Sequence, residues 1–386
     1  MRILVFSSSF PNPAEPINGS FVCKTLQAFP AEHELVVVAP VPFGLAARRG
    51  YKESIPVEEE VELGADLVKV YRPRYLLLPY NLLRPFIGFI MFLLCYGLVS
   101  RICKEKHIDL IHVHFAYPDG IAVSMISSLL KIPYLITEHR GLLRETLRNP
   151  WISSQLKTAY RKATEVVAVS DFNSTVLSSY SIKAKVIPNG IDFEHFTVNP
   201  AREHPSRLVL IANLIPAKGI ECLIEAISLL RNRGKHYSLD IIGSGKYRSS
   251  LEKKVQALKL DQEINFLGQL PPSRVEELLP RYDSLVVSSL RESFSVVIVE
   301  AMASGLPVIA TRCGGPEAIV QAETGILVQP ASAEALFQGI LELESKWESY
   351  DPYIIREFAR DKYSLDGVMQ SYLELYKSIL GSNSAK

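Results

Sequence analysis

Two glutamates, Glu292 and Glu300, are separated by seven residues within the stretch 291–307, which reads Arg-Glu-Ser-Phe-Ser-Val-Val-Ile-Val-Glu-Ala-Met-Ala-Ser-Gly-Leu-Pro. A strand-like run, 284–290, precedes them, and a helix stop with a second strand, 307–311, follows. The pattern predicts Glu300 inside a short helix and Glu292 in the loop that enters it. In an α/β sheet such a loop lies at the carboxyl end of a strand, where ligands bind and helix N–H groups attract anions. The two carboxylates could bind a ribose diol and a second polyol, which suits a sugar nucleotide.

Two neighbouring strand ends carry groups that suit a diphosphate. Lys218 follows the predicted strand 208–212 and opens a helix, where its charge adds to that of the exposed N–H groups. Gly243 and Gly245 follow the strand 239–242, and glycines there permit a tight turn and close approach to a ligand. A G-x-G pattern alone is a weak indication. An ordinary solvated side chain remains the alternative for Lys218, as it does for the glutamate in the helix.

The first half of the chain contributes a long proline-containing loop, 7–20, with Gly19 near its end, and three histidines. His139 follows a predicted strand, so it should project toward a ligand, although a purely structural histidine is the alternative. His112 and His114 share one face of a strand, a spacing that could hold a metal. Because no acidic or cysteine partner is suggested, we expect no metal site.

Composition narrows the class of protein. The 386 residues carry a net charge of +1, which argues against a nucleic-acid partner. Five scattered cysteines without a C-x-x-C pair favour a reducing compartment, hence the cytoplasm, and argue against a zinc or disulfide framework. Residues 1–6 are typical of a buried strand and too short for the apolar core of a signal peptide.

Short β-branched runs alternate with helical patterns along the whole chain, which predicts an α/β fold with a parallel sheet built twice. The turn-rich segment 188–192 divides the two halves. We therefore expect domains at 1–188 and 189–364, with a last helix, 365–380, packing back on the first. A ligand between such domains would lie at their strand ends.

The stretch 291–307 resembles the Glu-x7-Glu signature of retaining glycosyltransferases of family 4, which have the GT-B fold of two Rossmann-like domains facing each other across a cleft. Ser295 stands where glycine is common in the family; we expect it to cap the helix. The segment 213–219 resembles G-R-L-x-x-x-K-G, in which the arginine and lysine hold the leaving diphosphate. Lys218 matches the lysine, whereas Asn213 replaces the arginine.

The resemblance implies transfer of a sugar from a UDP- or GDP-linked donor to an acceptor hydroxyl, with retention and without a metal or other cofactor. It assigns Glu292 to the sugar, Glu300 to the ribose and Lys218 to the diphosphate, and gives His139 a contact with the transferred sugar. A phenylalanine, Phe266, marks a strand end near the base, although its own ring is expected in the core. The other donor-binding residues implied are Gly19, Asn213, Gly243, Gly245, Ser293, Phe294 and Ser295.

The run 86–99 is apolar throughout and has arginines on both sides. Its 14 residues fall short of the roughly 20 needed to span a bilayer. One interpretation is a buried crossover helix. The other is a basic and apolar surface on an anionic membrane, near a lipid-linked acceptor at the inner face of the cytoplasmic membrane. The basic residues considered are Arg72, Arg74, Arg84 and Arg101, with Arg48, Arg49 and Lys52 upstream.

Polysaccharide or glycolipid assembly is the process that we expect. Two other kinds of protein stay open: a GT-B-like phosphorylase or epimerase, and a non-catalytic module that binds a nucleotide sugar. No complete G-x-G-x-x-G follows the first strand of either half, which counts against a dinucleotide enzyme.

Overall fold

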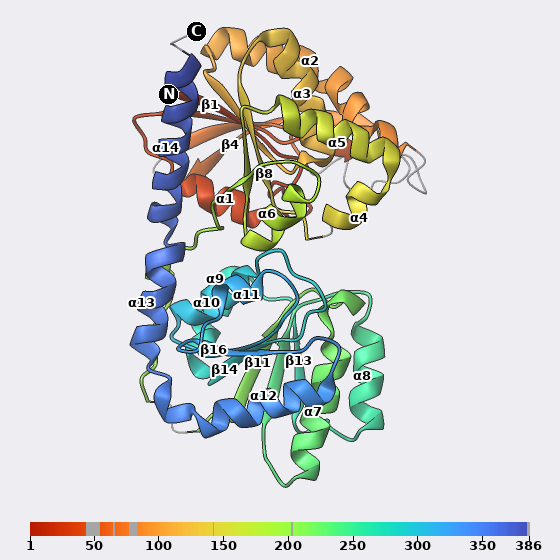
Figure 1. Cartoon of the computed structure of the whole chain (residues 1–386), viewed down its shortest axis with the longest axis vertical. Helices are drawn as coiled ribbons and strands as arrows, with labels where there is room; N and C mark the ends of the chain where they lie inside the picture. The colour runs from red at the N-terminus through yellow and green to blue at the C-terminus, as the bar shows by residue number, and fades with distance from the viewer. Residues whose placement is uncertain (44–54, 65, 77–82, 142, 202–203, 384–386) are drawn as a thin grey trace. The chain divides into compact units, whose positions relative to one another are not determined.

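The structure is a computed structural model that divides into two compact units, Met1–Gly190 with the segment from Leu365 onward, and Ile191–Ser364 (Figure 1). The sequence predicted these boundaries at residues 188 and 364. Arg48, Arg49 and Lys52 lie outside the described residues. The parts of the chain that the structure describes are 1–43, 55–64, 66–76, 83–141, 143–201 and 204–383.

The first unit is built on one sheet with the strand order β10-β9-β8-β7-β1-β2-β5-β4. Neighbouring strands are parallel except β4 and β5, which form an antiparallel edge. The strands are β1 (Arg2–Phe6), β2 (Glu34–Val38), β4 (Glu58–Leu63), β5 (Asp66–Tyr71), β7 (Leu110–His114), β8 (Tyr134–Glu138), β9 (Glu165–Ala168) and β10 (Lys185–Val186), with a small separate pair, β3 (Val41–Phe43) and β6 (Arg74–Leu76).

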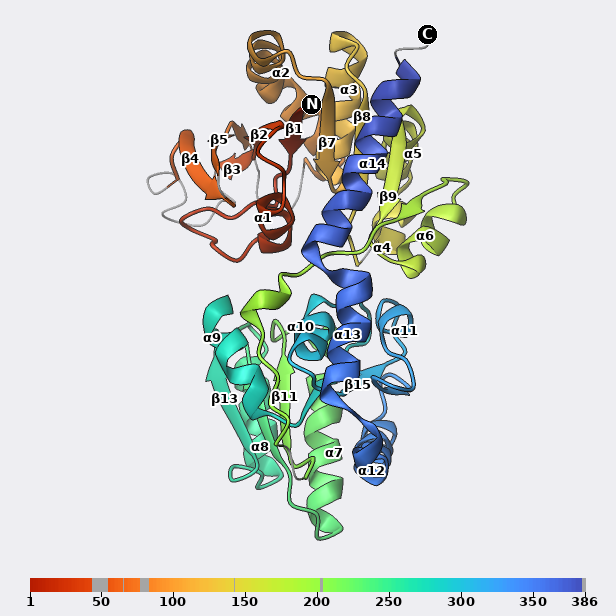
Figure 2. The same cartoon turned by 90° about the vertical axis from the view of Figure 1, so that its left-hand side faces the viewer.

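Helices cover both faces of this sheet, and β1 shows why. Leu4 and Phe6 point into one apolar core, whereas Ile3 and Val5 point into the other, as the two-residue period of a strand requires. The first core contains α2 (Ile87–Lys106), α3 (Ile121–Leu130), α4 (Leu143–Arg148), α5 (Pro150–Lys162) and α6 (Asp171–Ser178). The second contains α1 (Ser20–Gln27) and α14 (Leu365–Asn383), so the C-terminal helix belongs to the first unit (Figure 2).

The second unit is a parallel sheet with the order β13-β12-β11-β14-β15-β16. Its strands are β11 (Arg207–Ile211), β12 (Ser238–Ile242), β13 (Ile264–Gly268), β14 (Ser284–Val287), β15 (Val308–Thr311) and β16 (Gly325–Val328). Its helices are α7 (Ile220–Asn232), α8 (Arg248–Ala257), α9 (Pro272–Leu278), α10 (Val296–Ala303), α11 (Pro316–Ile319), α12 (Ala333–Ser345) and α13 (Pro352–Tyr363). Strand β14 ends at Val287, three residues before the predicted end at 290, so Ser288 and Ser289 belong to the loop.

Each sheet has a point at which the strand order reverses. In the second unit, β11 pairs with β12 on one side and with β14 on the other. In the first, β1 pairs with β2 on one side and with β7 on the other. At such a point, the loops that leave the carboxyl ends of two neighbouring strands, β11 and β14 or β1 and β7, run to opposite faces of the sheet. In parallel sheets a ligand binds between two such loops. The chemistry is therefore expected in the loops after β11 and β14 in the second unit and after β1 and β7 in the first.

Candidate functional site

The reversal point of the second unit holds an ion pair. Lys218, at the end of the short helix after β11, contacts Glu292, in the loop after β14, through its Nζ and the Glu292 Oε1. Ser289 donates a hydrogen bond to the same oxygen at 2.9 Å, and Ser288 donates one to the Lys218 carbonyl at 2.8 Å. The two charged side chains are 21% and 15% exposed. Lys218 is thus a cation fixed by its neighbours at the reversal point and not a solvated surface lysine.

The backbone of the loop that carries Glu292 is fixed against the loop after β15. The Glu292 N–H donates to the Cys313 carbonyl at 3.1 Å, and its carbonyl accepts from Gly315 at 2.9 Å. Phe294 is buried and packs edge-on against Tyr363, so its ring anchors the loop. Because the loop is fixed by the backbone hydrogen bonds of Glu292 and by the packed Phe294 ring, Glu292 has a defined position beside Lys218.

The residue immediately before helix α10, Ser295, does not cap the helix as the sequence predicts. Ser295 has φ 80° and ψ 76°, in the left-handed region, and its side chain makes no capping hydrogen bond. Its buried Oγ has no hydrogen-bond partner among the described residues. The prediction that this serine caps the helix is therefore wrong, because a capping residue needs an extended backbone. The position has the conformation that glycine adopts without strain.

Glu300 lies in the second turn of α10, as the sequence predicts. Its neighbours Val299 and Ala301 are buried against the sheet, whereas Glu300 itself is half-buried at the side of the helix. Ser293 is also half-buried, in the loop that leads into the helix. The two glutamates thus lie on either side of the start of α10, where N–H groups lack intrahelical acceptors.

The glycines after β12 lie directly against the loop after β11. A Cβ on Gly243 would stand 1.9 Å from the Ala212 carbonyl oxygen, and one on Gly245 would stand 2.2 Å from the Leu214 oxygen, so no other residue fits at either place. Asn213, between those two contacts, is exposed. Asn213 is therefore presented at the strand end by loops that pack backbone to backbone.

Phe266 corrects a second expectation, because its ring is half-buried and is not part of the core. It lies on the edge strand β13, and the Arg248 guanidinium stacks over it with 5.7 Å between the guanidinium carbon and the ring centroid. Arg248 is held by Glu252 at 2.7 Å. Sequence reasoning missed this arginine, although its place two residues after Gly243-Ser244-Gly245-Lys246, at a helix start, is a usable signal.

The reversal point of the first unit holds a buried carboxyl group. Asp119, in the loop after β7, accepts hydrogen bonds from the Ser8 N–H at 2.7 Å and the Ser8 Oγ at 3.0 Å, in the loop after β1. Burial raises the pKa of Asp119 to about 7, although the Ser8 hydrogen bonds act in the opposite direction. Gly19 closes the loop from Ser8 onward, since a Cβ there would lie 2.0 Å from the Ser9 oxygen. Sequence reasoning missed Asp119, which the topology alone brings to Ser8.

The three histidines form a group next to this loop, in which His112 and His114 are buried and His139 is half-buried. His139, just after β8, shares a hydrogen bond of 2.9 Å between its Nε2 and the Nδ1 of His114, and the two rings stack. His139 also contacts the ring of Phe21 at 4.7 Å between centroids. Burial lowers the pKa of His114 to about 3 and that of His139 well below its ordinary value. Both are therefore neutral hydrogen-bonding groups near neutral pH.

His112 is occupied within the protein interior. Its Nδ1 is 2.7 Å from the Tyr376 hydroxyl of α14, and its Nε2 is 2.8 Å from the Thr137 Oγ1. With both ring nitrogens bonded to protein groups, His112 is not available to a metal. Across the described residues, no group of three or more histidine, cysteine or acidic side chains has the geometry of a metal site.

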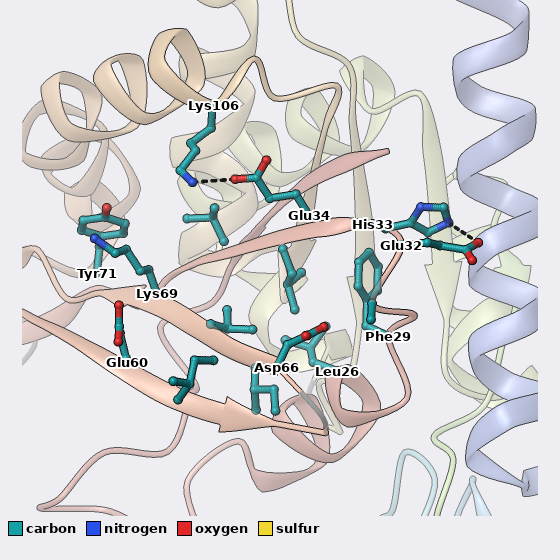
Figure 3. A pocket seen from close by; sticks show the side chains of 16 residues that line it. Leu26, Phe29, Glu32, His33, Glu34, Glu60, Asp66, Lys69, Tyr71 and Lys106 are labelled. Atoms are coloured by element: carbon teal, nitrogen blue, oxygen red, sulfur yellow. Dashed lines mark hydrogen bonds and ion pairs between the residues drawn. The ribbon is translucent and has the colours of Figure 1, made fainter.

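A cavity of about 460 Å³ lies elsewhere in the first unit (Figure 3). It is lined by the starts of β2 and β5 and by the Lys106–Glu34 ion pair of 2.6 Å. These are amino ends of strands, whereas ligands of parallel sheets bind at carboxyl ends. The charged groups at the reversal points, and not the size of this cavity, therefore define the candidate site.

Two family models match the chain. The model described as glycosyl transferases group 1 matches residues 192–358, and the model described as glycosyltransferase family 4 matches residues 20–195. The chain is 28% identical over 372 residues to the putative teichuronic acid biosynthesis glycosyltransferase TuaC of Bacillus subtilis (strain 168), with 89% of each chain covered. It is 29% identical over 273 residues to the D-inositol 3-phosphate glycosyltransferase of Corynebacterium glutamicum (strain R), covering 62% of this chain and 65% of the other.

Solved structures agree on the fold. Anabaena HepE in complex with UDP matches with a TM-score of 0.74 at 20% identity, covering 98% of this chain and 100% of the other. The sucrose-phosphate synthase from Thermosynechococcus elongatus matches with a TM-score of 0.77 at 19% identity, covering 99% and 100%. At these identities the similarity is one of fold.

Proposed function

We propose that this chain transfers a sugar from a nucleotide-diphosphate donor to an acceptor hydroxyl with retention of configuration. The chain belongs to the family 4, group 1 glycosyltransferases and has their GT-B fold. The observation that carries the proposal is the Lys218–Glu292 ion pair at the reversal point of the second unit, beside the start of α10. A cation and helix N–H groups suit a diphosphate, and a carboxylate suits sugar hydroxyls.

Donor binding would exchange the partners of this ion pair. The diphosphate brings its own negative charge to Lys218, which leaves the Glu292 carboxylate available to accept hydrogen bonds from the transferred sugar. Glu300 would accept from the ribose diol. The ion pair thus keeps Lys218 in position while the site is empty, so that little reorganisation accompanies binding.

The chemical step then needs no protein nucleophile. The bond between the anomeric carbon and the phosphate oxygen breaks, and Lys218 stabilises the negative charge that develops on the departing diphosphate. The acceptor hydroxyl attacks from the same face, forms the new glycosidic bond and gives its proton to the departing phosphate oxygen. Because Lys218 supplies the positive charge that a divalent cation supplies elsewhere, we expect activity without a metal.

The family pattern has an arginine where this chain has Asn213, so one of the two cations expected in the donor site is missing at that position. Asn213 can donate neutral hydrogen bonds only, whereas Arg248 is charged and lies beside Phe266 and Gly268. We assign Arg248 and Phe266 to the base side of the donor site. In the first unit we assign the neutral His139 to the transferred sugar, as the resemblance implies.

Relatives suggest the class of substrate. HepE was solved with UDP-glucose, and TuaC is named for teichuronic acid biosynthesis. We therefore propose a UDP- or GDP-linked sugar as donor, a saccharide or lipid-linked acceptor, and a role in polysaccharide or glycolipid assembly in the cytoplasm.

Calorimetric titration of the full chain with UDP-, GDP- and ADP-sugars tests the donor site directly. Binding of one nucleotide sugar, and a product of retained configuration by NMR in the presence of EDTA, is the expected result. Release of a sugar phosphate only when inorganic phosphate is added would indicate a phosphorylase instead. Binding without turnover on any acceptor tested would indicate a binding module.

A further inference from the structure

Helix α2 has two apolar faces, of which only one is used inside the protein. Ile87, Met91, Cys95 and Val99 recur every four residues and lie buried in the core beneath α2. A second apolar set is exposed: Phe86, immediately before α2, and Phe89, Leu93 and Leu94 within its first half. In the described part of the chain, Arg84–Lys106 is long and apolar enough to cross a membrane by length and composition. It is longer than the run 86–99 predicts.

Packing decides that α2 does not cross a bilayer in this fold. Its buried face contributes to the same core as Leu4 and Phe6 of the central strand, so removing the helix would uncover that core. Only a helix that lies along a surface can keep one apolar face on the protein and offer the other to a partner. The buried-helix interpretation of the sequence is thus correct for one face and leaves the other unexplained.

The exposed stripe continues onto neighbouring helices. Gln155, near the middle of α5, donates a hydrogen bond to the Pro85 carbonyl at 2.9 Å, which places the first half of α5 beside the residues that lead into α2. Trp151, one turn before Gln155, is 72% exposed. Both helix starts face the carboxyl edge of the sheet, because α2 and α5 run directly into the starts of the next strands, β7 and β9. The stripe therefore lies at the same edge as Asp119 and His139.

The charges around the stripe are almost all positive. Residues 83–104 contain no aspartate or glutamate. Arg84 is exposed just before α2, Arg144 and Arg148 are exposed on α4, which leads into α5, and Arg101 and Lys104 are exposed toward the end of α2. The acidic residues of these elements are Glu105, beyond the stripe, and Glu145, between two arginines.

Two of the arginines that the sequence suggested for this surface lie elsewhere. Arg72 is buried, forms an ion pair with Glu59 and donates to the Pro11 carbonyl at 2.9 Å, so it holds the loop after β1 and cannot meet a membrane. Arg74 is half-buried and donates to the Ile55 carbonyl at 3.3 Å. The prediction is wrong for Arg72 because a buried guanidinium requires a carboxylate partner, which the unpredicted strand β4 supplies.

From this surface we infer a membrane-docking site: the exposed stripe of α2 (Phe86, Phe89, Leu93 and Leu94), with Trp151 and the surrounding arginines, rests on an anionic lipid bilayer. Aliphatic side chains enter the acyl boundary, the indole occupies the interface, and the arginines meet lipid phosphates. The inference goes beyond the proposed function and does not depend on the donor site. It would bring the sheet edge that carries Asp119 and His139 to a substrate that carries a lipid.

Co-sedimentation of the full chain with vesicles of phosphatidylcholine, with and without phosphatidylglycerol, at low and high salt tests this surface. We expect binding to anionic vesicles at low salt, weakened about fivefold by each of Arg84→Ser and Arg148→Ser. Leu93→Ser should weaken it about tenfold. The matched control is Ile354→Ser in the second unit, because both side chains are 58% exposed. A protein that stays in the supernatant, or binds neutral vesicles equally well, would overturn the inference.

The chain has two tryptophans, so Trp347→Phe leaves Trp151 as a single reporter. Its emission should shift to the blue on adding anionic vesicles and return on adding salt. An unchanged emission spectrum in a sample that sediments with vesicles would place the contact elsewhere and refute the site.

Sedimentation velocity without lipid tests the alternative occupant, a second copy of this chain. A dimer that Leu93→Ser dissociates would show that the stripe binds a second copy. Because binding is read without a substrate, failure here leaves the donor-site proposal intact.

Discussion

The two units share a fold yet equip their reversal points in opposite ways. In the second unit the crevice holds a partly exposed ion pair, Lys218 with Glu292. In the first unit the equivalent loops are joined by a buried carboxyl group, Asp119, bonded to Ser8, with neutral histidines nearby. A partly exposed charged pair can exchange one partner for an anionic ligand, whereas a buried hydrogen-bonded network fixes loop shape. One topology thus presents a charged pair in one unit and a buried network that supports a loop in the other.

Removing the charge at the second unit should have the largest effect. Lys218→Ala is expected to lower turnover about 10²–10³-fold, since its cation acts on charge that develops in the transition state. Affinity for the nucleoside alone should change little. Single-turnover rates at saturating donor measure the first quantity and calorimetry the second. Lys253→Ala, on the exposed face of α8, is the control for loss of a surface charge. A rate within twofold of the parent protein would remove Lys218 from the mechanism.

Glu300→Ala should weaken binding of the nucleoside diphosphate by about 1.5–3 kcal/mol, the value of a hydrogen bond to a charged acceptor. Glu300→Gln keeps the shape of the side chain and should recover part of the loss. If the alanine variant binds the nucleoside diphosphate as the parent protein does, the ribose lies elsewhere. Comparison with Lys218→Ala then separates a ground-state contact from one made in the transition state.

Lowering the pH should destabilise the first unit through His112, His114 and His139. Their pKa values are lowered on folding, so the unfolded chain takes up protons first, and stability present above about pH 6.5 is lost as the pH falls toward about 3. His114→Gln should reduce the slope of the free energy of unfolding over this window by about 1.4 kcal/mol per pH unit. Urea titrations between pH 4 and 7 give the slope.

The pH dependence of the stability that Asp119 contributes has the opposite sign. Its pKa is raised from an ordinary 3.8 to about 7, so the stability it contributes is complete below about pH 3.8 and is lost as the pH rises toward 7. Asp119→Asn should remove that loss, since the amide cannot ionise. The same urea titrations in this variant give the answer. A loss of stability toward neutral pH that persists undiminished would mean that Asp119 is not its source.

The smallest effect concerns backbone strain at the start of α10. Ser295→Gly should raise the free energy of unfolding by about 1 kcal/mol, because glycine adopts the left-handed conformation without a Cβ clash. Ser295→Ala keeps the strain and removes only the hydroxyl, so it serves as the matched control. Urea unfolding measures both. Equal stability of the glycine and alanine variants would contradict the strain argument.

The sequence by itself determined the elements and the main charged groups of the second unit. The alternation of strands and helices predicts two parallel sheets, and the spacing of Glu292 and Glu300 places one in a loop and the other in a helix, because local patterns carry that information. Lys218 at a helix start is predictable for the same reason. These positions follow from residues close together in the chain.

Only the tertiary structure decided which distant groups meet. Nothing local connects Ser8 with Asp119, Arg72 with Glu59, or His112 with Tyr376, which lie 111, 13 and 264 residues apart. Such partners are set by strand order and by the return of α14 to the first unit, not by periodicity. The sequence also left open whether one face of α2 or both are buried, because an apolar run has the same composition in either case. The fold settles that by covering only one of them.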